Sequence, residues 1–349
     1  MIDTVKSHMI ADVPVGVFLS SGMDSTTIAA LAAELTGSSL HSVTLGFAEY
    51  RGTAADEVPL AAMVAKQLAI THDARWLVRE EFEADLPALL AAMDQPTVDG
   101  VNTYFVSKAA KEAGLKAALS GLGGDELFGG YSSFNQVPQL VRSVGKFPAA
   151  PAKALRIISA PLFKHFTSAK YAGLLEYGGT YGGAYLLRRG LFMPWELPEL
   201  LDPDVVAAGW RTLEPLVQLE ATIDDIENAR FRVAALEMTW YMRNQLLRDS
   251  DWAGMAHSIE IRVPLVDLTL LRAVIPVLLK SCGKTHMAQT PRIALPHEVL
   301  HRRKTGFSVP VQDWFNPGSA KSEGRGLRGW AMRLAREFDI IPGHKHQAA

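Results

Sequence analysis

The chain is organised around residues 15–25, which read Val15-Gly16-Val17-Phe18-Leu19-Ser20-Ser21-Gly22-Met23-Asp24-Ser25. An apolar run ends here in small polar residues, and a helix-forming segment, residues 26–35, follows at once. This pattern predicts a strand, a tight loop and a helix. The loop is therefore expected at a helix N-terminus, where backbone N–H groups and a partial positive charge suit an anion.

The side chains of this loop add to its chemistry. Ser20, Ser21 and Ser25 supply hydroxyl donors, and Gly22 lets the backbone approach a ligand closely. Asp24 places a carboxylate beside an anion site, which makes most sense if a cation such as Mg²⁺ bridges it to phosphate oxygens. The alternative is an ordinary strand-to-helix turn in which Asp24 or Ser25 caps the helix.

Length and composition narrow the classes of protein. The 349 residues can bury a large core and suggest roughly two domains. A formal net charge of -2 gives no sign of a nucleic acid or an anionic membrane as partner. The single cysteine, Cys282, excludes an internal disulfide and fits a reducing compartment. No apolar stretch reaches the roughly 20 residues of a membrane span, so we expect a cytoplasmic protein.

Short strands alternate with helical patterns over the first part of the chain. Strands are predicted at residues 41–47, 74–78 and 116–120, and helices at residues 1–11, 56–68, 80–93 and 102–113. This alternation predicts an α/β fold with a parallel sheet covered by helices on both faces. Ligands of such sheets bind outside the carboxyl ends of the strands. The loops 20–25 and 121–125 both follow strands, so they should meet at that edge.

Beyond about residue 134 strand patterns become scarce, and Leu, Ala, Arg and Met recur at helical spacing. We therefore expect an α/β core over residues 1–133 and a mainly helical subdomain over 134–315 that completes the site. Residues 316–349, with several glycines and a histidine-containing end, are expected to form a loosely packed tail. A chain that begins within a helical pattern is also what the C-terminal part of a longer protein would show.

A second glycine-rich loop occupies residues 120–131, Ser120-Gly121-Leu122-Gly123-Gly124-Asp125-Glu126-Leu127-Phe128-Gly129-Gly130-Tyr131. Its glycines indicate a backbone that is folded tightly around a ligand. Asp125 supplies a second carboxylate, and Mg²⁺ is usually held by one or two carboxylates together with substrate phosphates. The alternative is a glycine-rich turn in which Asp125 caps a helix.

Two further stretches combine charge with turns. Residues 248–267 are dense in charge yet apolar between the charges, which indicates buried ion pairs, a polar pocket wall or a charged helix end. Residues 302–310 begin with Arg302-Arg303-Lys304 before a turn. Such a run is usually a solvated basic patch, but a lysine at this place could also meet developing phosphate charge.

Together these residues resemble the synthetase domain of glutamine-hydrolysing asparagine synthetase, within the N-type ATP pyrophosphatases. That family carries SGGxDS, SGxGxDExFGGY, E-x-R-x-P-x-x-D and R-x-K-x-x-F elements. The matching segments are residues 20–25, 120–131, 260–267 and 302–307. Four matches in order are far more specific than any one of them, and the resemblance implies the adenine nucleotide alpha hydrolase-like, or PP-loop, fold.

The resemblance also implies roles for residues. ATP would place its pyrophosphate in the loop 20–25, and Asp24 and Asp125 would hold Mg²⁺. The backbone near Leu45, Ser120 and Gly121 would receive the adenosine. Lys304 matches the family lysine that contacts the phosphates during adenylation. The aspartate side chain would be activated as β-aspartyl-AMP with release of pyrophosphate, and ammonia would then give asparagine and AMP.

Two departures from the family leave alternatives open. Ser21 replaces the second residue of the SGG motif, and Leu122 stands where many asparagine synthetases have a glutamate linked to the aspartyl-AMP intermediate. Leu122 favours a ligase that adenylates another carboxylate, as β-lactam synthetases do. The family's glutaminase domain lies upstream of these motifs, so we expect either that ammonia comes from solution, or that a partner supplies it, or that the chain is a fragment of a longer protein. A nucleotide-binding remnant without turnover is a further alternative.

Two other patterns are weaker. His297-Glu298-Val299-Leu300-His301 fits the H-E-x-x-H pattern of zinc peptidases, but Pro296 places it at the very start of a helix. Gly283-Lys284-Thr285 resembles the end of a Walker A loop, but position 278 is Leu instead of the required first glycine. Neither is predicted to be functional.

Overall fold

The computed structural model describes residues 1–145, 147–166, 168–280, 283–302, 310, 314 and 327–341. The chain divides into two compact units. Unit 1 comprises Met1–Gly130 and Met242–Ala320, and unit 2 comprises Tyr131–Tyr241 and Lys321–Ala349.

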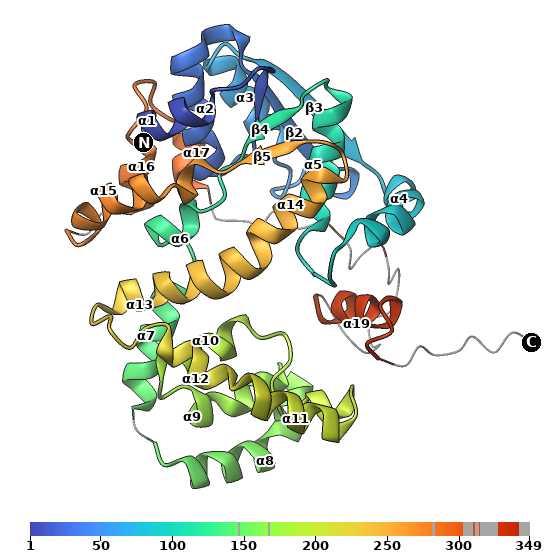
Figure 1. The fold of residues 1–349 in the computed structure, drawn as a ribbon, viewed down its shortest axis with the longest axis vertical. Helices are drawn as coiled ribbons and strands as arrows, with labels where there is room; N and C mark the ends of the chain where they lie inside the picture. Colours follow the sequence, from blue (N-terminus) through green and yellow to red (C-terminus); the bar gives the residue numbers. More distant parts are fainter. Residues whose placement is uncertain are drawn as a thin grey trace, which may run out of the picture. The chain divides into compact units, whose positions relative to one another are not determined.

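Unit 1 is built on a five-stranded sheet with the strand order β3-β2-β1-β4-β5 (Figure 1). The strands are β1 (Val15–Phe18), β2 (His41–Phe47), β3 (Thr71–Leu77), β4 (Ala117–Leu119) and β5 (Glu260–Arg262). Every neighbouring pair is parallel. The predicted α/β class with a parallel sheet is confirmed, and β3 begins three residues earlier than the sequence pattern indicates.

The helices of unit 1 precede, connect and follow these strands. They are α1 (Ile2–His8), α2 (Met23–Thr36), α3 (Val58–Gln67), α4 (Arg79–Ala92), α5 (Val101–Glu112), α6 (Gly124–Phe128), α14 (Leu247–Met255), α15 (Leu268–Leu278), α16 (Lys284–Ala288) and α17 (His297–His301). The strand order runs from β1 outward to β3 and then returns to β4 on the other side of β1. Because crossovers between parallel strands keep one hand, this reversal puts α2 and α3 on one face and α5 on the other.

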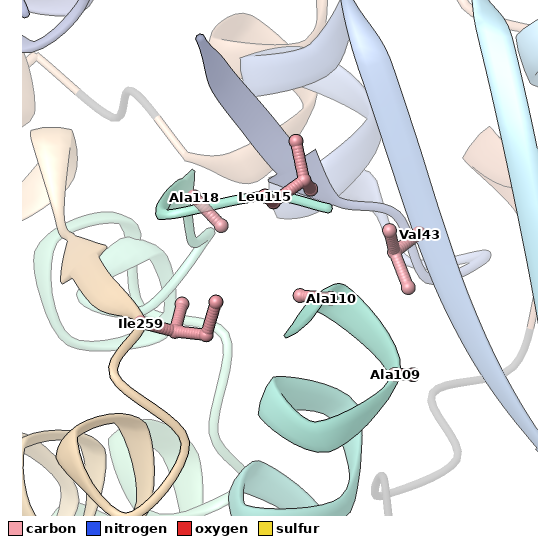
Figure 2. Close-up of a cluster of buried hydrophobic side chains, with 6 residues drawn as sticks. All are labelled: Val43, Ala109, Ala110, Leu115, Ala118 and Ile259. Atoms are coloured by element: carbon pink, nitrogen blue, oxygen red, sulfur yellow. The ribbon is translucent and has the colours of Figure 1, made fainter. Parts of the chain in front are cut away.

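Apolar side chains fill the space between α5 and the sheet. Figure 2 shows this cluster, which consists of Val43, Ala109, Ala110, Leu115, Ala118 and Ile259. Small alanines on α5 and β4 let the helix approach the strands closely. On β1, Val17 is 0% exposed, as expected for a strand covered on both faces. Such burial explains why the central strands read as continuous apolar runs.

The strand β5 explains why the units do not follow the expected boundaries. The sequence pattern predicts one helical subdomain over residues 134–315, but β5 pairs with β4 in the register Ala118–Ile261. The described residues of 242–320 therefore group with the sheet of unit 1. A three-residue strand within a charged segment carries too little periodicity to be recognised locally.

Unit 2 is helical in its described residues. Its elements are α7 (Ser133–Val144), α8 (Ala149–Phe166), η3 (Ala169–Gly173), α9 (Leu174–Tyr177), α10 (Tyr181–Arg189), η4 (Leu197–Glu199), α11 (Pro203–Leu213), α12 (Pro215–Ala221), α13 (Ala229–Leu236) and α19 (Leu327–Glu337), and the division at 241/242 falls within the π-helical segment η5 (Glu237–Leu246). The helix α10 contributes Tyr185 and Ala184 to two separate apolar clusters. It is the central helix of this unit.

A buried carboxylate stabilises the interior of unit 2. Glu237 is 0% exposed and accepts hydrogen bonds from Tyr185 Oη (3.1 Å) and Arg189 Nε (2.9 Å). The guanidinium of Arg189 also stacks on Tyr241 and Tyr131, at 3.7 and 4.4 Å from the ring centroids. The charge is therefore both paired and hydrogen-bonded, which is the condition for burying it at acceptable cost.

The expected loose tail contains a packed helix. In α19, Trp330 is 4% and Leu334 is 1% exposed, and Arg328 Nη1 lies 2.7 Å from Glu196 Oε1. Over the described ranges, none of the helices combines the length and apolar character needed to cross a membrane.

Candidate active site

The two glycine-rich loops lie where the strand order of unit 1 reverses. Residues 20–25 follow β1, and residues 120–130 follow β4, the strand that pairs with β1. A reversal between adjacent parallel strands opens a crevice at their carboxyl ends, which is where ligands of such sheets bind. The predicted meeting of the two loops therefore follows from the sheet topology.

The first loop is closed by its own hydroxyl groups. The Oγ atoms of Ser20 and Ser25 are 2.7 Å apart, and the Ser20 N–H donates to Ser25 Oγ (3.2 Å). The Gly22 N–H donates to Ser20 Oγ (3.2 Å). Ser21 is 0% exposed, and its backbone N–H bonds to the carboxylate of Glu57. These bonds fix the backbone between β1 and α2.

Gly22 is the N-cap of α2, so neither Asp24 nor Ser25 has the capping role of the alternative interpretation. As a glycine, this N-cap residue makes no side-chain hydrogen bond to the first turn of the helix. The loop 20–25 therefore leads directly into the N-terminus of α2, and a helix N-terminus suits an anionic ligand.

The second loop forms the short helix α6 between two glycines in left-handed conformations, Gly123 (φ +93°) and Gly129 (φ +74°). The loop packs directly on the start of α2. A Cβ on Gly121 would lie 2.7 Å from the backbone nitrogen of Ser25, and one on Gly124 would lie 2.6 Å from the Asp24 carboxylate. The glycines at these positions are therefore required by the close approach of the two loops.

Asp24 and Asp125 are each the second residue of a helix that directly follows a strand. Their carboxylates meet at one cation. Lys284 Nζ lies 2.5 Å from Asp24 Oδ2 and also forms an ion pair with Asp125 Oδ1. The three side chains are between 14% and 19% exposed. The structure thus brings together the two predicted carboxylates and adds a lysine that the sequence analysis set aside.

The electrostatics of this cluster are dominated by the two carboxylates. Burial by itself lowers the pKa of Lys284, but the attraction of Asp24 and Asp125 outweighs it, and the pKa is raised above its ordinary value. The lysine is therefore charged at neutral pH. The carboxylate oxygens already converge on one cation, and hard oxygen donors of this kind suit Mg²⁺. The residues present fit a magnesium ion.

The other predicted site residues have different places. Ser120 follows β4, and its N–H donates to Arg262 O (2.8 Å), while Leu45 lies in β2, two residues before its end, and is 2% exposed. Lys304 lies outside the described residues, so its predicted contact with phosphate stays a prediction.

The segment 260–267 supports the second loop through hydrogen bonds and packing with neighbouring elements. Arg262 in β5 donates to the carbonyls of His8 (2.6 Å) and Ile10 (2.8 Å), and so ties the end of α1 to the sheet. Asp267 caps α15 by accepting from the Leu270 N–H (2.9 Å). Between them, Val266 packs so closely that a Cβ on Gly123 would lie 2.7 Å from its Cγ2. This segment is a support for the second loop.

Lys284 is the residue that sequence reasoning missed. It begins the short helix α16 after Gly283, far along the chain from Asp24. The Gly-Lys-Thr pattern was noticed, but its only local explanation was a Walker A loop, which the sequence does not complete. A lysine whose partner Asp24 lies 260 positions earlier, and whose second partner Asp125 is also far away in the chain, leaves no local signal.

The H-E-x-x-H pattern forms the five-residue helix α17. The rings of His297 and His301 stack at 3.8 Å, and His301 Nδ1 lies 3.0 Å from the His297 carbonyl oxygen. Over the described ranges, no group of three or more His, Cys, Asp or Glu side chains gathers into a metal site. Nothing at this helix supports a zinc peptidase.

Comparisons with known proteins identify the family of the chain. The model of the family "Asparagine synthase" matches residues 1–329, and the chain belongs to this family. A Mycobacterium bovis protein provisionally named a glutamine-hydrolysing asparagine synthetase is 31% identical in an alignment of 364 positions that covers 98% of this chain and 53% of that protein. Asparagine synthetase 1 of Bacillus subtilis is 32% identical over 96% of this chain and 51% of its own length.

Asparagine synthetase B of Escherichia coli is 33% identical in an alignment of 153 positions that covers 39% of this chain and 27% of that protein. The chain spans about half the length of the long curated relatives it matches.

Proposed function

We propose that the chain is an ATP-dependent amide-forming ligase that activates the side-chain carboxylate of aspartate and transfers it to ammonia. The observation that carries this proposal is the meeting of Asp24, Asp125 and Lys284 at the reversal of the sheet, between two loops that both match the family. A cation site next to a helix N-terminus is what a metal-bound triphosphate requires.

Each part of the crevice then has a role. The loop 20–25 and the first turn of α2 bind the pyrophosphate part of ATP, and the backbone near Leu45, Ser120 and Gly121 receives the adenosine. Asp24 and Asp125 hold Mg²⁺, which neutralises charge on the phosphate oxygens when it is bound. Lys304, whose position the structure does not describe, is the family's candidate for a further contact with the phosphates.

The chemistry follows from the poor reactivity of a carboxylate. A carboxylate oxygen of aspartate attacks the α-phosphorus, the bond to the β-phosphate oxygen breaks, and pyrophosphate leaves. The acyl carbon of the resulting β-aspartyl-AMP is then attacked by ammonia, and AMP leaves with the bonding electrons. The protein's contribution is to orient the groups and to place positive charge where negative charge develops.

A second candidate differs only in the carboxylate. Leu122 lies in the second loop, with its N–H bonded to Ser120 Oγ (3.3 Å), where many asparagine synthetases have glutamate. An aliphatic side chain cannot accept a proton or pair with an ammonium group. This favours a ligase that adenylates another acid.

One assay separates these candidates. The protein is incubated with Mg-ATP, ammonium and either aspartate or a panel of other carboxylic acids, and both pyrophosphate and the amide are measured. Pyrophosphate and asparagine together support the proposal, whereas pyrophosphate with another acid alone supports the second candidate. Nucleotide binding without pyrophosphate from any acid indicates a remnant and overturns both. Glutamine replaces ammonium in a parallel series to test the nitrogen source.

Two variants place the activity at this site. Asp125→Asn should reduce pyrophosphate formation severely, because one of two metal ligands loses its charge. His301→Ala, in the H-E-x-x-H helix, should leave the rate close to that of the wild type. A folded His301→Ala variant without activity would contradict the site assignment.

A further inference from the structure

Lys284 occupies the point at which the two predicted metal ligands converge. Its Nζ lies 2.5 Å from Asp24 Oδ2 and is paired with Asp125 Oδ1 at the same time. The Lys284 side chain is 14% exposed, so the two ion pairs are largely shielded from water. Ion pairs with this little exposure are much less screened by salt than pairs at the surface.

The local structure holds the lysine in this position. Lys284 is the first residue of α16, and the helix is anchored by Met287 (1% exposed) and Ala288 (3% exposed). The end of the side chain passes over Gly130, where a Cβ would collide with Lys284 Cε and with Asp125 Oδ1. The slot that holds the Lys284 side chain is therefore bounded by the anchored helix α16 and by Gly130, whose lack of a side chain leaves room for the lysine.

An ammonium group and a divalent cation cannot use the same oxygens at once. Mg²⁺ binds carboxylate oxygens at about 2.0–2.1 Å and would take the point between Asp24 and Asp125 that Nζ now occupies. A metal ion can therefore enter only if Lys284 withdraws. A lone metal ion would leave this partly buried ammonium without its two anionic partners, which is unfavourable.

A metal ion that arrives with a triphosphate changes this balance. The phosphate oxygens are anionic, and the flexible four-carbon stem of lysine lets the ammonium move from the carboxylates to these oxygens. The metal ion then takes the carboxylates and the lysine keeps a charged partner. Lys284 thus opposes the binding of a free cation but favours the binding of a metal-bound nucleotide.

We propose that Lys284 makes the site selective for the metal–nucleotide complex by competing with the free divalent cation for Asp24 and Asp125. This inference rests on the proposed function in assigning the two carboxylates to a metal. It predicts that lysine removal strengthens binding of a free cation and weakens binding of the metal–nucleotide complex. A lysine that only stabilised the fold would not change the two affinities in opposite directions.

The test measures binding without catalysis. Mn²⁺ replaces Mg²⁺, and its free concentration is followed by electron paramagnetic resonance in titrations of the wild type, Lys284→Met and Lys284→Gln. The same proteins are then titrated with Mn²⁺ and the non-hydrolysable α,β-methylene analogue of ATP. Lys280→Met, at an exposed lysine four residues earlier, is the matched control, and circular dichroism checks that each protein is folded.

Both Lys284 variants should bind free Mn²⁺ at least tenfold more tightly than the wild type, and the metal–analogue complex at least tenfold more weakly. Lys280→Met should match the wild type in both titrations. Equal affinity of the wild type and a folded Lys284 variant for free Mn²⁺ would overturn the inference. If Mn²⁺ responds as expected but no protein binds the analogue or forms pyrophosphate, the competition stands and the proposed ligase function fails.

Discussion

Arg302 Nη1 lies 3.6 Å from Glu57 Oε1, and Glu57 in turn bonds to the backbone N–H of Ser21 in the first loop. Both side chains are mostly buried, at 12% exposure for Glu57 and 16% for Arg302. Burial raises the pKa of Glu57, and the nearby guanidinium of Arg302 opposes that rise only in part. A single carboxylate therefore connects the loop after β1 to an arginine of the family's R-x-K-x-x-F element.

Glu57→Gln should uncouple this connection while keeping an acceptor for the Ser21 N–H. We expect the unfolding free energy to change by no more than about 1 kcal/mol, because loss of the ion pair with Arg302 is offset by relief of the burial cost that raises the pKa of Glu57. The KM for ATP should rise more than kcat falls, since the loop is displaced rather than the reacting groups. Urea denaturation and steady-state pyrophosphate assays measure the two effects.

A double-mutant cycle provides the control for this pair. Glu57→Gln and Arg302→Gln together should cost less than the sum of the two single changes, with a coupling of about 1 kcal/mol or more. Strict additivity would show that the two side chains do not interact in solution.

Gly130→Ala tests the slot beside Lys284. The new Cβ would collide with the side chains of Asp125 and Lys284, so one of them must move. We expect nucleotide affinity and turnover to fall at least tenfold while the far-ultraviolet circular dichroism spectrum is kept.

Gly209→Ala is the matched control for this substitution. Gly209 lies inside α11, and a Cβ there would meet no atom within 4 Å. Alanine should therefore stabilise the protein by about 0.5–1 kcal/mol and leave activity unchanged. Equal loss of activity in both variants would remove the special role of Gly130.

Asp249 gives a prediction about pH. This residue of α14 is 3% exposed and accepts hydrogen bonds from Thr97 Oγ1 (2.8 Å) and Trp252 Nε1 (3.0 Å). Burial raises its pKa from 3.8 to about 6, despite these two hydrogen bonds. The folded protein thus binds this proton more tightly than the unfolded chain. The stability that it contributes is present below pH 4 and is lost as pH rises through 6.

Asp249→Asn should remove the loss of stability that accompanies deprotonation of this carboxyl group as pH rises. The unfolding free energy of the variant, relative to the wild type, should increase by about 2–3 kcal/mol between pH 4 and pH 7. Denaturant titrations at several pH values measure this difference. The same substitution at the exposed Asp251 is the control and should change stability by no more than about 0.5 kcal/mol at any of them. A difference for Asp249→Asn that does not vary with pH would contradict the burial of a charge there.

Arg189→Leu tests the buried carboxylate of unit 2. The substitution removes the ion pair between Arg189 Nη2 and Glu237 Oε2 (2.7 Å). The carboxylate of Glu237 is 0% exposed and would keep the hydroxyl groups of Ser133 and Tyr185 as hydrogen-bond donors. We expect a loss of about 3–5 kcal/mol in unfolding free energy. The exposed residue next to it, Arg188, donates from Nη2 to Ser132 Oγ (2.8 Å). Arg188→Leu removes this hydrogen bond and should lower the unfolding free energy by less than about 1 kcal/mol. Similar losses in the two variants would show that the buried pair contributes nothing special.

The sequence predicts the elements whose signal is local. The strands β1 and β4 are apolar runs that lead into loops with serine and glycine, and the helices between the strands carry their own periodicity. Because two loops that follow parallel strands must share an edge, the meeting of Asp24 and Asp125 is predictable as well. The first unit can therefore be derived as far as β4 from patterns in the chain.

The features that the sequence does not predict depend on distant partners. The strand β5 has three residues, and only its pairing with β4, some 140 positions earlier in the chain, makes it a strand. Lys284 has a charged partner on each of two loops and an ordinary neighbourhood of its own. The packed helix α19 lies in a segment whose glycines suggest a loose tail, although Trp330 and Leu334 on the helix are apolar and buried.

The late position of β5 has a consequence for how the protein is made. While the ribosome is still translating unit 2, β4 is already complete, and one side of it has no neighbouring strand. An open strand edge readily pairs with another chain. Nascent molecules are therefore most prone to associate with each other during this interval, and a protein cut short before residue 260 would carry the exposed edge permanently.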